Sequence, residues 1–127
     1  MDQWTLPFDM SAAGRARALV EEQLGSSPRV ADISLVVSEL VTNAVEHGEP
    51  PVMFGIDSSV DTSTDANTVR IRVTVSDEGG GEPRVRDAAD HATGGRGLAL
   101  VEMLASRWQW RRDGKRLTVW AEFDSAH

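Results

Sequence analysis

Between Ser27 and Gly48 the chain carries two helical patterns, one apolar and one polar. Glu39, Asn43 and His47 recur at every fourth position. In an α-helix this spacing keeps their side chains within roughly 80° of arc over about 12 Å. An apolar stripe of helical period runs beside them and consists of Val30, Ile33, Val37, Leu40 and Ala44. Because Glu39 and Asn43 lie about 80–120° from this stripe, we expect a long helix with a polar row at the edge of its packed face.

Capping residues predict where this helix and two others begin and end. Ser27 followed by Pro28 is a typical start for the long helix. A preceding helix is expected to begin at a Ser11 cap and to stop at Gly25, and a third helix is expected to begin near Gly97. The first of these should bury Ala12, Ala16, Leu19, Val20 and Leu24, and the third should bury Leu98, Val101, Leu104 and Ala105.

Alternation of apolar and polar residues predicts five strands. The clearest strand runs from Val69 to Ser76, with its valine and isoleucine residues on one face. Asp113 and Gly114 supply a hairpin turn between the last two strands. The polar stretch Ser58–Thr68 is expected to be a long surface connection. The other four strands are expected at Trp4–Phe8, Val52–Ile56, Arg107–Arg111 and Leu117–Phe123.

The order of these elements predicts an α+β fold. A two-layer α/β sandwich accounts for it most simply, with a mixed five-stranded sheet and three helices on one face. The sequence shows no internal repeat and no convincing domain boundary, so we expect residues 1–127 to form a single domain.

Composition limits the classes of function. The formal net charge of −7 argues against a nucleic-acid-binding surface and favours basic or mixed protein partners. Because the chain has no cysteine, disulfides and thiolate chemistry are excluded. No apolar run approaches the length of a membrane span, and the N-terminus lacks the features of a signal peptide. We therefore expect a complete cytoplasmic protein with neither a membrane nor a nucleic acid as its partner.

Two glycine clusters point to a nucleotide. The first, Asp77–Gly81, follows the clearest strand, and the second, Gly94–Leu98, opens a helix. Glycines permit close approach of a ligand, and a helix N-terminus offers unpaired N–H groups to phosphate. A dinucleotide-binding fingerprint fits poorly because no helix follows the first cluster directly. A P-loop is excluded because neither cluster carries the required lysine.

Taken in order, the three motifs resemble the N, G1 and G2 boxes of the histidine-kinase-like (GHKL) ATPases. The chain is most similar to the small stand-alone anti-sigma-factor serine kinases of that superfamily, from about Trp4 to Phe123. The resemblance implies the Bergerat/GHKL ATP-binding fold, with ATP and Mg²⁺ as cofactors. It also implies that residues 82–93 form a lid over the nucleotide.

The resemblance assigns a role to each matching residue. Glu39 would be the catalytic general base, taking a proton from a serine or threonine hydroxyl. Asn43 would be the Mg²⁺ ligand, and Asp77 would accept a hydrogen bond from the adenine amino group. For His47, packing or capping at the helix end remains as good an interpretation as phosphate contact. The expected cofactor-binding residues are Asn43, His47, Asp77, Gly79, Gly81, Gly94, Gly95, Arg96, Gly97 and Leu98.

The resemblance also implies a partner and a reaction. The expected function is an anti-sigma factor that sequesters a sigma factor and phosphorylates an anti-anti-sigma (STAS-type) protein on serine or threonine. The alternative is an ATP-dependent protein-binding module without kinase activity. A homodimer is compatible with the resemblance, since dimerisation is common in that family. Trp108, Trp110 and Trp120 are expected in the core or on the face of the sheet, and any exposed one would mark a protein interface.

Overall fold

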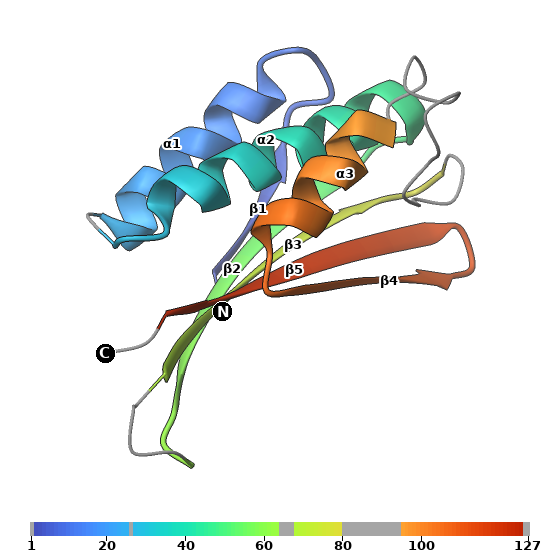
Figure 1. Cartoon of the computed structure of the whole chain (residues 1–127). Coiled ribbons are helices and arrows are strands. Elements are labelled where there is room, and N and C mark those ends of the chain that lie inside the picture. The colour runs from blue at the N-terminus through green and yellow to red at the C-terminus, as the bar shows by residue number, and fades with distance from the viewer. Residues whose placement is uncertain (1, 26, 64–67, 80–94, 126–127) are drawn as a thin grey trace.

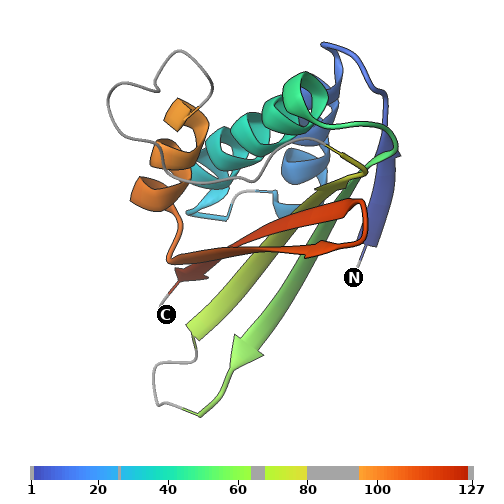
Figure 2. The ribbon, with the colours of Figure 1, turned by 90° about the vertical axis from the view of Figure 1, so that its right-hand side faces the viewer.

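The computed structural model describes residues 2–25, 27–63, 68–79 and 95–125. Within these residues the chain forms three helices and five strands (Figure 1). Their bounds are β1 Asp2–Leu6, α1 Ala12–Leu24, α2 Val30–His47, β2 Val52–Asp61, β3 Thr68–Asp77, α3 Gly95–Leu104, β4 Arg107–Asp113 and β5 Arg116–Ser125. The helices lie in one layer on one face of the sheet (Figure 2), which confirms the α+β two-layer prediction.

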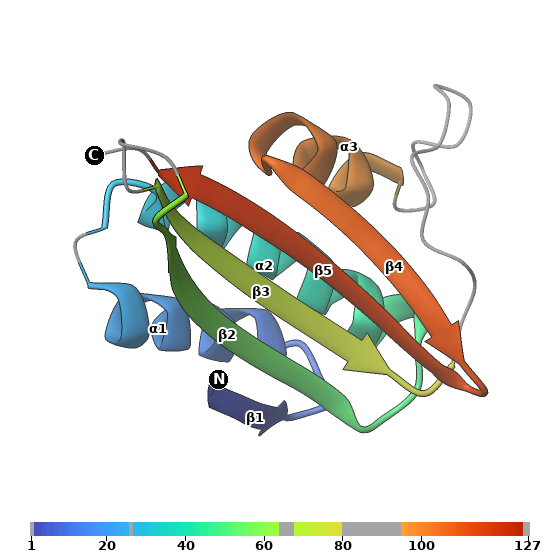
Figure 3. The ribbon, with the colours of Figure 1, turned by 90° about the horizontal axis from the view of Figure 1, so that it is seen from below.

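The strand order in the sheet is β1-β2-β3-β5-β4, and every pair of neighbours is antiparallel. The prediction of a mixed sheet is therefore wrong. The connection through α3 does return β4 in the same direction as β3. However, β5 is inserted between these two strands by the β4–β5 hairpin, so no parallel strands become neighbours. Figure 3 shows this order on the face of the sheet that the helices leave uncovered.

The hairpin of β2 and β3 is longer than the sequence pattern predicts. The two strands stay paired as far as Asp61 and Thr68, so Ser58–Asp61 belong to β2 rather than to a surface connection. The hairpin projects past the helical layer (Figure 2), and residues 57–60 are exposed. Because no helix covers a face there, no apolar alternation is needed, and the pattern that reveals the rest of the strand is lost.

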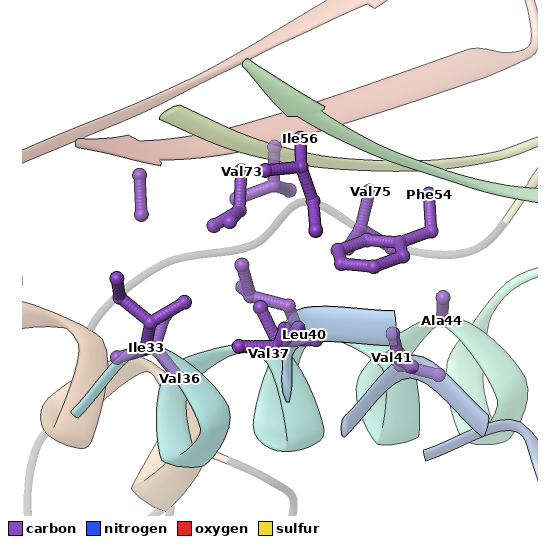
Figure 4. Packing of buried hydrophobic residues seen from close by; sticks show 14 of the residues in the cluster. Ile33, Val36, Val37, Leu40, Val41, Ala44, Phe54, Ile56, Val73 and Val75 are labelled. Atoms are coloured by element: carbon purple, nitrogen blue, oxygen red, sulfur yellow. The ribbon is translucent and has the colours of Figure 1, made fainter. Parts of the chain in front are cut away.

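The core lies between α2 and the middle of the sheet. Four of the five stripe residues of α2 are buried, and Val36 and Val41 widen this packed face. They face buried side chains of β2 and β3, among them Phe54, Ile56 and Val73 (Figure 4). Burying an aliphatic or aromatic side chain of this kind contributes about 1.5–3 kcal/mol, so this contact fixes the position of α2 on the sheet.

The helix starts differ in detail from the capping pattern. Ser11 occupies the N-cap of α1, but its side chain makes no capping hydrogen bond within the described residues. Instead, the Asp9 carboxylate accepts from the backbone N–H of Ser11 at 2.8 Å. Helix α2 begins at Val30, because Ser27 first forms a turn in which its carbonyl accepts from the N–H of Val30 at 3.1 Å. The Ser27–Pro28 start therefore marks a turn before the helix.

Candidate functional site

The polar row of α2 lies on the flank away from α1. Ser38 accepts a hydrogen bond from Arg17 of α1 at 2.9 Å, so it marks the flank that faces α1. At about 100° per residue, Glu39 and Asn43 lie about 100° and 140° further round the helix. That flank borders α3, which packs beside α2 (Figure 1). Glu39 and Asn43 are both partly buried, as expected at the edge of a packed face.

His47 ends this row and is the last residue of α2. Its side chain is 50% exposed, and its Nε2 lies 3.8 Å from Oε2 of the exposed Glu46. An exposed pair of this kind contributes little to stability. The exposure argues against a packed structural role for His47, and a role in phosphate contact stays a prediction.

Asp77 is a buried carboxylate at the end of β3, with only 5% of its surface exposed. Its Oδ1 accepts a hydrogen bond from the backbone N–H of Gly79 at 2.9 Å. Burial raises the pKa of Asp77, whereas backbone hydrogen bonds from Gly79 and Glu49 and the positive charge of Arg112 oppose that rise. These interactions offset only part of the cost of burying the charged carboxylate, so a further hydrogen-bond donor would stabilise its ionised form.

The ends of α2 and β3 are joined beside this carboxylate. The backbone N–H of Glu78 donates to the carbonyl of Glu49 at 2.9 Å. The Arg116 guanidinium of β5 donates to the Glu78 carboxylate at 2.8 Å. These contacts were not singled out from the sequence, because a main-chain hydrogen bond between segments far apart in the chain leaves no residue signature. They bring Asp77 beside the C-terminal end of α2, where the polar row ends at His47.

The second glycine cluster leads into α3, as predicted, although the helix begins at Gly95 rather than near Gly97. This first turn lies beside the C-terminal half of α2 (Figures 1 and 3). Leu98 is buried, with 5% exposure. The expected ligand contacts at Gly81 and Gly94, together with the expected lid at residues 82–93, lie outside the described residues.

The three tryptophans of the last two strands divide between core, sheet face and surface. Trp108 packs against the core, and its Nε1 donates to the Glu102 carboxylate of α3. Trp120 is partly buried beneath the Arg72 guanidinium, whose Cζ lies 5.9 Å from the ring centroid. Trp110 is 36% exposed, so it is the one of the three that could contribute most to a protein interface.

In the described part of the chain, no helix has the length and apolar character needed to span a membrane.

Comparison with known proteins shows the family. Residues 8–123 match the histidine kinase-like ATPase domain. The fold is similar to the crystal structure of the RsbU and RsbW domains of Rv1364c from Mycobacterium tuberculosis, with a TM-score of 0.68 and 23% identity over 99% of this chain and 32% of that chain. It is also similar to the Erythrobacter litoralis EL346 blue-light activated histidine kinase, with a TM-score of 0.51 and 24% identity over 89% of this chain and 40% of that chain.

These structural likenesses show the fold, and this chain spans well under half of either protein. The match to the family, by contrast, spans all three helices and the strands from β2 to β5, except the last two residues of β5, and leaves out β1. This chain therefore belongs to the histidine kinase-like ATPase domain family, and that membership implies that it binds ATP.

Proposed function

We propose that this chain is an ATP-binding regulator whose nucleotide site is formed by the α3 flank of α2 and the end of β3. The observation that carries the proposal is the Asp77 carboxylate, which is buried and held by the backbone N–H groups of Gly79 and Glu49. The same junction holds the end of the helix that presents Glu39 and Asn43. Asp77, the proposed acceptor for the base, thus lies on a strand that is hydrogen-bonded to the segment just after the helix carrying Glu39 and Asn43, the proposed groups for phosphate chemistry.

The chemistry of Asp77 fits adenine. An ionised carboxylate only accepts hydrogen bonds, and adenine presents an amino donor where guanine presents a carbonyl. With guanine, two acceptors would face each other in a buried place, and an unmet buried polar group costs about 1–3 kcal/mol. Asp77→Ala, or the exchange of ATP for GTP, should therefore weaken binding about 10–100-fold.

Asn43 fits a Mg²⁺ ion that is held mainly by the nucleotide. The amide oxygen of Asn43 is a hard ligand suited to Mg²⁺. Among the described residues, no group of three or more histidine, aspartate or glutamate side chains could hold a metal without help. Mg²⁺ usually takes one or two protein ligands and completes its coordination with phosphates and water, which matches a site with one amide oxygen.

Glu39 fits a general base for transfer to a hydroxyl. It lies one turn before Asn43, about 6 Å along the helix axis. As the hydroxyl oxygen of a partner serine or threonine bonds to the γ-phosphorus, the bond from that phosphorus to the β–γ bridging oxygen breaks and ADP leaves. The hydroxyl proton passes to the Glu39 carboxylate. ATP supplies the phosphoryl group in this reaction.

The partner proposal rests on the resemblance to anti-sigma-factor kinases. In that role the chain would hold a sigma factor and phosphorylate an anti-anti-sigma protein of the STAS type. This chain also shares its fold with a protein that contains an RsbW domain, and that likeness is compatible with the proposed role. The net charge of −7 suits a basic, DNA-binding client.

Calorimetry with ATP, GTP and Mg²⁺ tests the nucleotide site. Wild-type chain should prefer ATP, and Asp77→Ala should lose most of that preference. Glu22→Gln serves as a control, because Glu22 is exposed on α1 and takes no part in the proposed site. Equal affinities of the wild-type chain for ATP and GTP would refute the proposed role of Asp77.

A second experiment separates binding from chemistry. Asn43→Ala should abolish the Mg²⁺-dependent part of ATP affinity, whereas Glu39→Gln should bind ATP almost normally. Proteins that co-purify from native extract with the wild-type chain are then incubated with labelled ATP. Recovery of a sigma factor together with a partner labelled on serine or threonine supports the proposal, and Glu39→Gln should abolish the label. A bound partner that wild-type chain never labels would favour the binding module without kinase activity.

A further inference from the structure

Gly48, which follows the last residue of α2, lies where a side chain has no room. Its backbone angles, φ −104° and ψ −163°, are open to any residue, so backbone conformation does not explain the glycine. A Cβ at this position would lie 2.3 Å from Oδ1 and 2.4 Å from Cγ of Asp77. It would also lie 2.7 Å from the carbonyl oxygen of Ala44. Real Cβ atoms essentially never come within 3.0 Å of such atoms, so something would have to move.

The atoms around Gly48 cannot retreat easily. The Ala44 carbonyl is part of α2 and accepts the N–H of Gly48 at 2.9 Å. The Asp77 carboxylate is buried, and its backbone pairs with Leu117 of β5. Gly79 differs in this respect, because a Cβ there would meet the side chain of Glu49, with its Cγ at 2.6 Å, and that side chain can rotate away.

We propose that Gly48 is a positioning residue for base recognition, and that its missing side chain sets the place of the Asp77 carboxylate. This inference rests on the proposed function of Asp77 as the acceptor for adenine. To restore ordinary contact, a Cβ would have to push the carboxylate away by about 1 Å, the difference between 2.3 and 3.4 Å. A shift of that size takes a hydrogen-bond acceptor out of range of a donor placed for it. Gly48 thus acts on selectivity through Asp77, without touching the base itself.

The test is a double-mutant cycle with Gly48→Ala and Asp77→Ala, measured by calorimetry with ATP and GTP. Alone, Gly48→Ala should weaken ATP binding about 10–100-fold and reduce the preference for ATP over GTP. In the Asp77→Ala background the carboxylate is absent, so Gly48→Ala should change the ATP affinity by less than about twofold. Equal effects of Gly48→Ala in the two backgrounds would overturn the proposal.

Gly25→Ala is a matched control. Gly25 also follows a helix, but its φ is +58° and nothing lies within 4 Å of the place of its Cβ. Alanine there strains the backbone and should lower stability while leaving the preference for ATP over GTP unchanged. If Gly25→Ala alters that preference as much as Gly48→Ala does, the effect reflects general destabilisation and the proposal is wrong.

Two further outcomes separate this inference from the function on which it rests. If wild-type chain binds no ATP, the proposed function fails, and the role of Gly48 in recognition fails with it. If wild-type chain binds ATP through Asp77 but Gly48→Ala binds and selects as wild type does, only the Gly48 inference fails. Should Gly48→Ala not fold, Gly48→Ala/Asp77→Ala should regain part of the lost stability, because the contact with Asp77 is relieved while the contact with the Ala44 carbonyl oxygen remains. A double variant no more stable than Gly48→Ala would overturn the proposal.

Discussion

Replacing Arg29 with alanine should destabilise the fold, because its guanidinium joins three elements. Nη1 donates to the carbonyl of Asp124 at the end of β5, at 3.0 Å. Nη2 donates to the carbonyl of Leu104, the last residue of α3, at 2.6 Å. The Cζ atom also lies 5.2 Å from the ring centroid of Phe123. Arg29 itself is the N-cap residue of α2, so one side chain fastens the start of α2 to the ends of α3 and β5.

The magnitude follows from these contacts and their partial burial. Hydrogen bonds from a charged group contribute about 1.5–3 kcal/mol each, and a cation at the C-terminus of a helix adds about 0.3–1 kcal/mol. Two features reduce the net value: the buried Nε has only the Asp32 carboxylate near it among the described residues, as an ion pair at 3.4 Å without a hydrogen bond, and the Arg29 side chain is 24% exposed. We expect Arg29→Ala to lower the free energy of unfolding by about 2–3 kcal/mol. Arg29→Lys should lower the free energy of unfolding by about half as much, because an ammonium group lacks the planar fork that reaches both carbonyls.

Urea unfolding at neutral pH measures this loss directly. For a chain of this size, about 2–3 kcal/mol corresponds to a decrease in melting temperature of roughly 6–15 °C. Arg15→Ala is the matched control, since Arg15 is exposed on α1 and its replacement should change stability by no more than about 0.5 kcal/mol. If Arg29→Ala is as stable as Arg15→Ala, the guanidinium does not hold the three elements together and the reasoning is wrong.

Two ionisable sites give further predictions. Arg107 pairs with Glu122 at 2.9 Å and with Asp124 at 2.7 Å, so Arg107→Ala should cost about 1–2 kcal/mol in urea unfolding at neutral pH. Hydrogen bonds from Arg107 lower the pKa of both carboxyl groups, so this stabilisation is present above their ordinary pKa values and should be lost as pH falls through the lowered ones. Burial raises the pKa of Asp77, so the wild-type chain should lose stability relative to Asp77→Asn as pH rises from the ordinary value to the raised one. A stability difference between those two chains that does not change with pH would contradict the burial argument.

The sequence predicts best where one helix or strand packs against the core. Four of the five residues of the α2 stripe, and most of the apolar face of the strand ending in Asp77, are buried in the structure as their periodicity indicates. The pattern fails where packing is absent, as in Ser58–Asp61, where the β2–β3 hairpin leaves the helical layer. Sheet order is also invisible to periodicity, because alternation reports which face is buried and not which strand lies next to it. That is why the antiparallel pairing of all neighbouring strands was not predicted.

The sequence nominates the residues of the candidate site, and their roles toward a ligand stay predictions. The contacts among these residues were not predicted. Asp77 stands out through its glycine motif, and its burial agrees with the predicted role in binding a base. Gly48 reads in sequence as an ordinary helix stop, because only the folded chain shows that Asp77 occupies the space of its side chain. No sequence pattern singles out Arg29, although its side chain reaches two distant carbonyl groups. Contacts between segments far apart in the chain cannot be read from one sequence by local pattern.

These contacts give the two ends of α2 different tasks. At its start, Arg29 fastens the helix to the ends of α3 and β5 through backbone carbonyl groups that any residue would supply. At its end, Gly48 and the Glu49–Glu78 hydrogen bond fit the helix against the Asp77 carboxylate, the group proposed to recognise the base. A change at the first end should therefore lower stability and leave base preference intact, whereas a change at the second should alter both. The two ends of this 18-residue helix lie about 27 Å apart by its rise per residue, so each end can be perturbed separately.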